Sequence, residues 1–219
     1  MPYDLKGRNV LITGGSRGLG AVLAHTFAAE GCNIAINFQS SEAVARELAN
    51  EVEEKYSVKA TIIKAGYTKF TTDWSDLDAL GEDDWDKCWA VNVKGKLALM
   101  RAALPTFRAN PDGGVFLITS SIAGVSQGGS SMAYSVTKAA QLHLMKCLAA
   151  SQGEKVRINA VLPGLLLTDW GNLYGEERIK SLKERAALKK DTDLHDCANA
   201  FVMLAKNTSI TGAKIQVGE

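Results

Sequence analysis

Residues 9–20, NVLITGGSRGLG, decide the fold of this chain. An apolar run of strand length, residues 9–12, leads into a glycine-rich turn, and a helical pattern follows over residues 21–30. A second run of strand length occupies residues 33–38. Together they form a βαβ unit, in which glycines let the backbone approach a pyrophosphate at the positive end of the helix. The stretch therefore predicts a dinucleotide-binding site; the alternative is a glycine turn without a ligand.

The end of the second strand predicts which dinucleotide binds. A carboxylate there would bind the ribose 2′-hydroxyl of NAD(H) and repel the 2′-phosphate of NADP(H). Here the strand ends at Asn37 and Phe38, and the first acidic residue is Glu42. Because no carboxylate occupies that place and Arg17 lies in the glycine turn, we favour NADP(H) over NAD(H). In the other interpretation, Arg17 is a solvated loop charge.

The rest of the chain alternates between helical and strand patterns, which predicts an α/β fold. Helices are expected over residues 42–56, 85–107, 132–150, 175–190 and 194–205, and strands over 58–65, 115–119, 157–162 and 213–217. No repeat or low-complexity linker divides the chain. We therefore expect residues 1–219 to form one Rossmann-type domain, a doubly wound parallel sheet in a three-layer αβα arrangement.

Tyr134 and Lys138 open the predicted helix over residues 132–150. Four residues make slightly more than one helical turn, so the phenol and the ammonium project from the same face. A tyrosine has a reference pKa of about 10, and a fixed cation beside it favours the phenolate. The pair suits proton transfer to or from an alcohol or carbonyl oxygen. In the plainer interpretation, a half-buried tyrosine and a solvated lysine merely share a face.

Composition argues against several other classes of protein. The 25 Lys plus Arg nearly balance the 24 Asp plus Glu, so the charge predicts no binding to nucleic acid or to a membrane surface. No apolar run approaches the ~20 residues of a spanning helix, and the N-terminus lacks a signal-peptide core. No metal-ligand spacing links the cysteines and histidines, which are Cys32, Cys88, Cys147, Cys197, His25, His143 and His195. We expect reduced core cysteines, no metal and a cytoplasmic protein.

The combined motifs resemble the short-chain dehydrogenase/reductase family over nearly the whole chain. Residues 13–20, TGGSRGLG, match the family's cofactor loop, and residues 157–164, RINAVLPG, followed by Thr168, match its nicotinamide-contacting segment. The catalytic tetrad matches at Asn92, Ser121, Tyr134 and Lys138. Ser121 precedes Tyr134 by the family's usual 13 positions, and we therefore reject its neighbour Ser120.

The resemblance implies a role for each residue of the tetrad. Tyr134 is expected to be the general acid in ketone reduction, or the base in alcohol oxidation. Lys138 is expected to lower the pKa of Tyr134 and to hold the nicotinamide ribose, while Ser121 donates a hydrogen bond to the carbonyl oxygen. Asn92 is expected to fix a water in a proton relay. The alternatives are that Ser121 is a turn residue and that Asn92 ties a helix bend to nearby backbone.

The implied function is an NADP(H)-dependent oxidoreductase that interconverts a carbonyl and an alcohol by hydride transfer. Its cofactor contacts are expected at Gly14, Ser16, Arg17, Gly18, Leu19, Gly20, Ser40, Tyr134, Lys138, Pro163, Gly164 and Thr168. A rival from another class is a catalytically silent dinucleotide-binding or scaffold protein. A second enzymatic rival uses the same tetrad for epimerisation or dehydration.

The chain departs from the family between the strand over residues 58–65 and the helix of Asn92. Family members have another helix and strand there, so a unit on the order of 30 residues is absent near residues 65–66. The lost strand would lie in the middle of the sheet, beside the first strand, and its loss leaves backbone groups unpaired. Either the protein carries these residues and the printed sequence omits them, or the deletion is real. We favour the first because every catalytic motif is retained; an intact mass above 23.4 kDa would reveal the omission.

Two further expectations concern the substrate and the assembly. Residues 165–167, Trp170 and Tyr174 follow the Pro163-Gly164 turn, where family members place a substrate lid, and Phe70 and Trp74 face them in this interpretation. They favour an apolar or aromatic substrate, with plain core packing as the alternative. The family uses the helix over residues 132–150 in oligomer contacts, so we expect a homodimer or homotetramer. Its second face carries Ala140, His143, Leu144 and Cys147.

Overall fold

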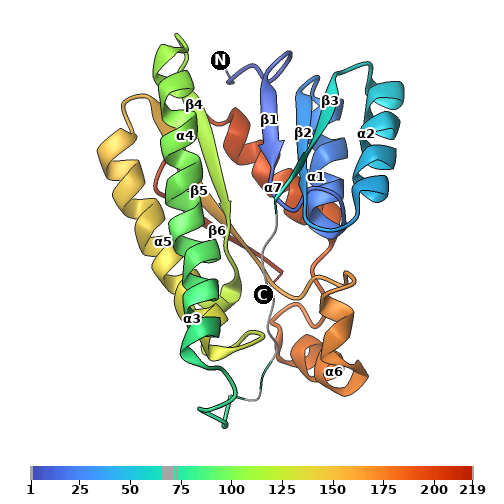
Figure 1. Cartoon of the computed structure of the whole chain (residues 1–219), viewed down its shortest axis with the longest axis vertical. Helices are drawn as coiled ribbons and strands as arrows, with labels where there is room; N and C mark the ends of the chain where they lie inside the picture. Colours follow the sequence, from blue (N-terminus) through green and yellow to red (C-terminus); the bar gives the residue numbers. More distant parts are fainter. Residues whose placement is uncertain (1, 66–71, 73, 219) are drawn as a thin grey trace. The chain divides into compact units, whose positions relative to one another are not determined.

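A computed structural model describes residues 2–65, 72 and 74–218 of the chain (Figure 1). The chain divides into two compact units. The first, which we call the glycine-loop unit, comprises Met1–Tyr67, Leu165–Thr208 and Val217–Glu219. The second, the tyrosine unit, comprises Thr68–Gly164 and Ser209–Gln216. The assignment of residues 1–219 to a single domain stays a prediction.

The glycine-loop unit begins with alternating strands and helices. These are β1 (Asn9–Ile12), α1 (Gly18–Ala29), β2 (Asn33–Phe38), α2 (Glu42–Tyr56) and β3 (Ala60–Lys64). The strands are parallel and lie in the order β1-β2-β3, with Ile12 opposite Ile36 and Ile36 opposite Ile62. Later in the chain the unit adds the short 3₁₀ helix η3 (Gly171–Tyr174), α6 (Glu176–Arg185) and α7 (Leu194–Lys206), which contacts α1.

Helices bury one face of this sheet and leave apolar residues exposed on the other. On β2, Ile34, Ile36 and Phe38 are buried, and α1 and α2 both contact this strand. The alternate positions of the neighbouring strands point the other way, and there Leu11 is 50% exposed and Ile63 is 45% exposed. Because side chains alternate between the two faces of a strand, the second face of this sheet lacks a complete cover.

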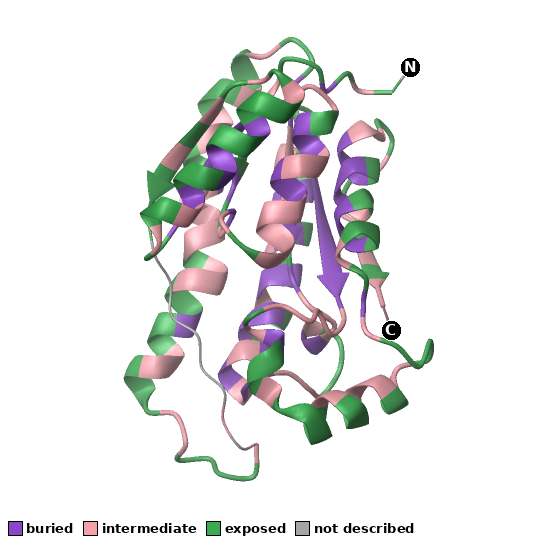
Figure 2. Cartoon of the chain, turned by 90° about the vertical axis from the view of Figure 1, so that its right-hand side faces the viewer, coloured by how far each residue is buried: buried purple, intermediate pink, exposed green. Residues whose placement is uncertain are grey.

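The tyrosine unit contains the second sheet and the long helices (Figure 1). Its elements are α3 (Glu82–Trp89), a π-helical turn η1 (Ala90–Lys94), α4 (Gly95–Ala109), β4 (Gly114–Thr119), the 3₁₀ helix η2 (Ile122–Gly124), α5 (Met132–Gln152), β5 (Val156–Pro163) and β6 (Lys214–Val217). The strand order is β4-β5-β6, and β4 runs parallel to β5. The core joins Met100, Ile118, Met145 and Ile158 from α4, β4, α5 and β5. Figure 2 shows that buried positions occur on both the strands and the helices of the chain.

The α/β Rossmann-type prediction is confirmed, but the described strands form two separate sheets rather than one. The split leaves β1 at the edge of one sheet and β4 at the edge of the other. A lost central strand has this consequence, because its two neighbours then have no partner on one side. Residues 66–71 lie outside the described residues, and Phe70 is one of them. The junction near residues 65–66 is therefore not described.

Other predictions need smaller corrections. The single helix expected over residues 85–107 is interrupted by the π turn η1, since helical periodicity cannot reveal one inserted residue. The helix after the glycine turn begins at Gly18, three positions before the predicted Ala21. Of the four cysteines predicted in the core, Cys147 is exposed, because it lies on the outer face of α5.

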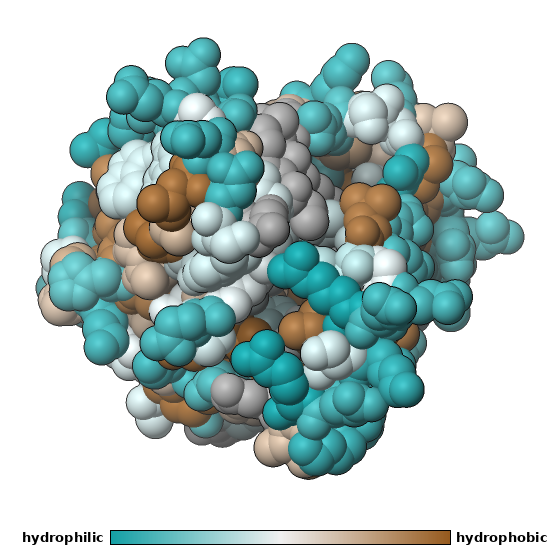
Figure 3. Space-filling model, turned by 90° about the horizontal axis from the view of Figure 1, so that it is seen from below, coloured by the Kyte–Doolittle hydropathy of each residue, from teal (hydrophilic) through white to brown (hydrophobic). Residues whose placement is uncertain are grey.

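No helix in the described part of the chain is long and apolar enough to cross a membrane. On the face seen in Figure 3, apolar side chains form separate groups among hydrophilic ones.

Candidate active site and cofactor site

The glycine loop between β1 and α1 requires glycine for two distinct reasons. Gly18 has φ +51°, in the left-handed region that side chains disfavour, and a Cβ there would lie 2.9 Å from Cγ2 of Thr168. At Gly20 the backbone is ordinary, but a Cβ would clash with the carbonyl oxygen of Gly14. The loop and the first turn of α1 therefore pack closely, which leaves the backbone accessible to a ligand such as a pyrophosphate.

Asn37, at the end of β2, holds the loop in place. Its backbone carbonyl accepts from Gly15 N at 2.8 Å, and its Oδ1 accepts from Gly14 N at 3.1 Å. Its Nδ2 donates to the carbonyl oxygens of Ile63 and Ala65, each at 3.1 Å. These contacts of Asn37 cannot be predicted from the sequence, because they reach 23 to 28 positions along the chain.

The first turn of α1 suits an anion. Its N-cap is Arg17, whose extended backbone leads into the helix and whose side chain makes no capping hydrogen bond. Gly18, Leu19 and Gly20 form this turn and follow Ser16 and Arg17. The amide groups of a first turn point outward without helical partners and carry the positive end of the helix dipole. The predicted pyrophosphate contacts thus belong to one loop and helix start, which fits a dinucleotide.

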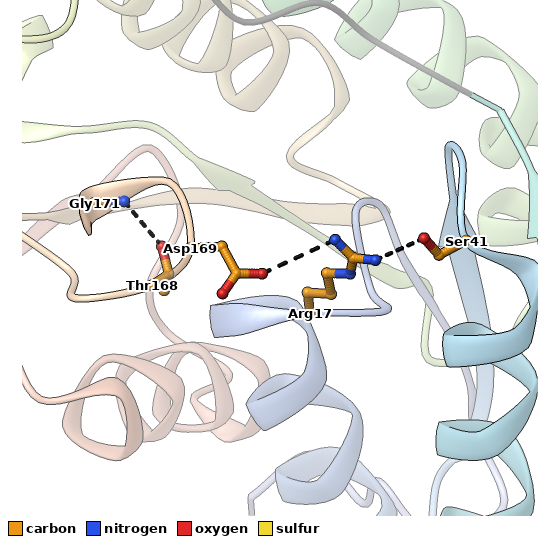
Figure 4. Close-up of polar contacts among 5 residues, drawn as sticks. All are labelled: Arg17, Ser41, Thr168, Asp169 and Gly171. Atoms are coloured by element: carbon orange, nitrogen blue, oxygen red, sulfur yellow. Dashed lines mark hydrogen bonds and ion pairs between the residues drawn. The ribbon is translucent and has the colours of Figure 1, made fainter. Parts of the chain in front are cut away.

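Arg17 lies between two side chains from distant segments (Figure 4). Its Nη2 donates to Oγ of Ser41 at 2.6 Å, and its Nη1 lies 3.9 Å from Oδ2 of Asp169. Asp169 is 84% exposed, so this ion pair contributes little to stability. The prediction named its neighbour Ser40 beside the cofactor, and that contact stays a prediction; the hydrogen bond with Ser41 is an additional contact at this place. It places a hydroxyl and a guanidinium together at the end of β2.

Thr168 and Gly171 shape the segment after β5. The Oγ1 of Thr168 accepts from Gly171 N at 3.4 Å (Figure 4). The Cγ2 of Thr168 lies close to Gly18, 2.9 Å from where a Cβ would be. Thr168 therefore lies close to the glycine loop, and its contact with the cofactor stays a prediction. Pro163 ends β5 in the tyrosine unit, and Gly164 follows it directly.

Tyr134 and Lys138 share one face of α5, as predicted. The helix starts at N-cap Ser131, whose Oγ accepts from Tyr134 N at 3.1 Å. The Nζ of Lys138 lies 5.4 Å from the centroid of the Tyr134 ring and donates to Thr119 O, at the end of β4, at 2.8 Å. Lys138 is only 8% exposed, so the alternative of a solvated lysine is wrong.

Burial lowers the pKa of Lys138 from 10.5 to about 7, and the like charge of Lys96 adds to this effect. Burial disfavours the charged ammonium because water no longer solvates it. The pKa of Lys96 is itself lowered by burial. Lys138 therefore titrates near neutral pH in the protein without cofactor, where a change of its charge alters the electrostatics around the Tyr134 phenol.

The two serines after β4 have different partners. Ser120 is buried, and its hydroxyl donates to the backbone carbonyl of Lys138 at 3.3 Å. Ser121 caps η2, where its Oγ accepts from Ala123 N at 3.2 Å. This bond uses an acceptor position of Ser121, so its hydroxyl hydrogen can be donated to another oxygen. The choice of Ser121 over Ser120 as the catalytic serine stays a prediction.

Asn92 lies within the π turn η1 and connects to α5 through two bonds. Its Nδ2 donates to Oγ1 of Thr137 at 3.0 Å. Its backbone carbonyl accepts from Nε2 of Gln141 at 2.8 Å. Such π turns occur often at functional sites. The predicted water at Asn92 stays a prediction. Gln141, which contacts the backbone carbonyl of Asn92, was not among the predicted site residues.

Family models match the chain in two overlapping stretches. The model described as short chain dehydrogenase matches residues 8–73, and the model described as Enoyl-(Acyl carrier protein) reductase matches residues 60–218. The second covers more than half of the chain. The overlap of the two includes the junction near residues 65–66.

Similar proteins cover nearly the whole chain. The 3-oxoacyl-[acyl-carrier-protein] reductase FabG of Staphylococcus epidermidis is 28% identical, over 96% of this chain and 97% of the relative. A short chain dehydrogenase from Burkholderia cenocepacia, solved in complex with NADP, is 25% identical, with a TM-score of 0.87 over 99% and 98% of the two chains. The NADPH-dependent 3-quinuclidinone reductase of Rhodotorula rubra, at 22% identity, shares the fold with a TM-score of 0.89 over 98% and 91%.

The match to the Staphylococcus protein also bears on the absent unit. It extends over 239 residues, whereas this chain has 219, so at least 20 positions (239 less 219) have no counterpart here. The relative is nevertheless matched over 97% of its length. The shortfall is thus internal to the match, as the predicted loss of a helix and a strand requires.

Proposed function

The chain belongs to the short-chain dehydrogenase/reductase family, and from this premise we propose that it is an NADP(H)-dependent oxidoreductase that interconverts a carbonyl and an alcohol by hydride transfer. The observation that carries the proposal is the buried Lys138 ammonium 5.4 Å from the centroid of the Tyr134 ring. Few roles other than tuning a proton transfer account for a buried lysine beside a phenol, because burial of its charge is costly.

Proton transfer falls to Tyr134. In the direction of reduction, its hydroxyl gives a proton to the carbonyl oxygen, and in oxidation its phenolate accepts one. The Lys138 ammonium stabilises the phenolate that forms during reduction and that must already be present before oxidation begins. NADPH, when bound, supplies the hydride for the carbonyl carbon.

Ser121 stabilises charge on the substrate. As the carbonyl carbon accepts hydride, negative charge grows on the oxygen, and a donor already in place stabilises it without reorganisation. The hydroxyl of Ser121 is held by Ala123 N through an acceptor position, so its hydrogen can serve this oxygen. The roles of Ser121 and Asn92 are proposals that rest on this bonding pattern and on the family.

The cofactor preference for NADP(H) rests on Arg17 and Ser41. Together they offer a guanidinium and a hydroxyl 2.6 Å apart, beside a strand end without a carboxylate. A guanidinium fork matches a phosphate well, whereas a ribose hydroxyl gains much less from it. The relative from Burkholderia was solved with NADP, which supports the same choice.

An apolar or aromatic carbonyl compound is the proposed substrate. The rings of Trp170 and Tyr174 lie 6.3 Å apart in the segment around η3, and Leu173 between them is 72% exposed. Exposed apolar side chains in the segment where the family places a substrate lid favour an apolar ligand. We also propose a homodimer or homotetramer through α5, whose exposed positions include Val136; a monomer at micromolar concentration in sedimentation equilibrium would reject it.

The test uses purified protein, NADPH and a panel of ketones, aldehydes and quinones. The proposal predicts substrate-dependent loss of NADPH absorbance that Tyr134→Phe removes while NADPH binding persists. The rival of a catalytically silent protein is favoured by the split between the two sheets, and it predicts tight cofactor binding without turnover on any substrate. Epimerisation or dehydration would leave no net oxidation of NADPH.

A further inference from the structure

Gln141 is a fully buried polar residue one turn beyond Lys138 on α5. Its Nε2 donates to the backbone carbonyl of Asn92 at 2.8 Å, and its Oε1 accepts from Nζ of Lys138 at 3.5 Å. Buried amides are expensive unless both ends have partners. This side chain therefore connects the Lys138 ammonium to the π turn, and both of its ends are used.

The π turn explains why the backbone carbonyl of Asn92 is available. Within Ala90–Lys94 the helix widens, and Gly95 N donates to Ala90 O, five residues back. Such a turn moves carbonyls out of the regular i→i+4 pattern, so a side chain from a neighbouring helix can donate to one of them. Gln141 does so from α5, the element with which η1 is in contact.

Neutral oxygens hold the ammonium of Lys138. Thr119 O, from β4, is 2.8 Å from Nζ, and Oε1 of Gln141 is the more distant acceptor. The charge that acts on Lys138 from α4 is the like charge of Lys96, and from α5 the titratable neighbour is Tyr134. With these groups around it, each acceptor oxygen favours the protonated lysine.

Resting on the proposed function, we propose that Gln141 is a positioning residue for the reaction. It fixes the Lys138 ammonium against the π turn at Asn92 and keeps its proton in place beside Tyr134. An amide oxygen at 3.5 Å is a weak partner, so its effect is a graded shift in the titration of Lys138.

Two substitutions move that titration in opposite directions. Gln141→Met keeps the length of the side chain and removes its hydrogen bonds to Asn92 and Lys138. The pKa of Lys138 therefore falls by about half a unit or more. Gln141→Glu keeps an acceptor and adds charge, so the same pKa rises. Since reduction requires both the Lys138 ammonium and the protonated phenol, the basic limb of kcat/KM against pH shifts downward in the first variant and upward in the second.

The matched control is Met145→Leu, one turn further along α5 and fully buried in the core of the same unit. It perturbs packing but touches neither bond of Gln141. We expect Met145→Leu to leave the basic limb at its wild-type position. Gln141→Met should also lower kcat/KM by about threefold, because the bond that it removes from the ammonium is weak.

The titration is measured in two ways, by kcat/KM for carbonyl reduction with NADPH and by NMR of isotope-labelled lysine in the full chain, with Lys138→Met to assign the signal. Opposite shifts in the two Gln141 variants support the proposal. Unchanged titration in both, with only a loss of stability like that of Met145→Leu, overturns it. If wild type shows no turnover, the proposed function fails, and the NMR titration still decides the role of Gln141. Should one variant not fold, the direction of shift in the other decides.

Discussion

The two sheets differ in how completely they are covered. In the tyrosine unit, β5 is buried along almost its whole length, with Val156, Ile158 and Val161 each at 0% exposure. In the glycine-loop unit, β1 is an edge strand of four residues, and its Leu11 is half exposed. The proposed proton-transfer residues therefore belong to a densely packed unit. Among the described strands, the sheet of the cofactor loop ends at β1, and its second face is incompletely covered.

The contrast extends to electrostatics. Lys138 acts from a buried position, where its charge depends strongly on pH. Arg17 is 53% exposed, and its contacts with Ser41 and Asp169 are open to solvent and salt. We therefore expect the catalytic step to respond to pH and the cofactor contact to respond to ionic strength.

The largest effect should come from a matched pair of core substitutions. Ile158→Ala removes a fully buried side chain from β5 and should cost roughly 2–5 kcal/mol of unfolding free energy. Leu11→Ala, on the open face of the other sheet, should cost less than about 1 kcal/mol, since little area is lost. Urea unfolding measures both. Equal costs would show that the open face is covered in solution.

Lys138 should make stability depend on pH. Its pKa is lowered in the folded protein, so between pH 7 and 10.5 the unfolded chain binds more protons, and stability rises with pH in that window. The gain from this group between pH 7 and about 9 should be about 2 kcal/mol. Chemical denaturation at both pH values should show it in wild type and not in Lys138→Met. The exposed Lys146→Met, on the same helix, is the control and should retain it.

Arg17→Ala tests the cofactor contact. Removing the guanidinium should raise the KM for NADPH by about tenfold and leave the KM for NADH nearly unchanged, as for loss of a charge-assisted contact with phosphate. The wild-type preference for NADPH should also weaken in high salt. Arg46→Ala, which removes only an exposed ion pair with Glu42, is the control. A parallel loss for both cofactors would place Arg17 away from the 2′-phosphate.

Local patterns allowed much of this to be predicted from sequence. The boundaries of β1, β2 and α2 match the predicted ranges, because each depends on short-range periodicity and glycine positions. Tyr134 and Lys138 were found because both lie on one helix at a fixed spacing. The absence of a helix and strand near residues 65–66 follows from the resemblance to the family, whose members have both there, and the two separate sheets agree with it.

Long-range contacts could not be predicted. Asn37 binds the glycine loop from another strand, Ser41 contacts Arg17, and Gln141 reaches the backbone of Asn92. In none of these pairs does the separation along the sequence predict that the two residues are in contact. The π turn was hidden for a different reason, because one additional residue in a helical turn hardly changes the apolar pattern.

The central claim is that hydride reaches a carbonyl carbon while Tyr134 supplies the proton. The most direct measurement uses NADPH carrying deuterium at the position of the transferred hydride, with mass spectrometry of the alcohol formed from a ketone substrate. Wild type should produce alcohol with one deuterium on the carbinol carbon, and Tyr134→Phe should bind NADPH and produce almost none. Alcohol without deuterium, or equal labelling by both proteins, would contradict the account.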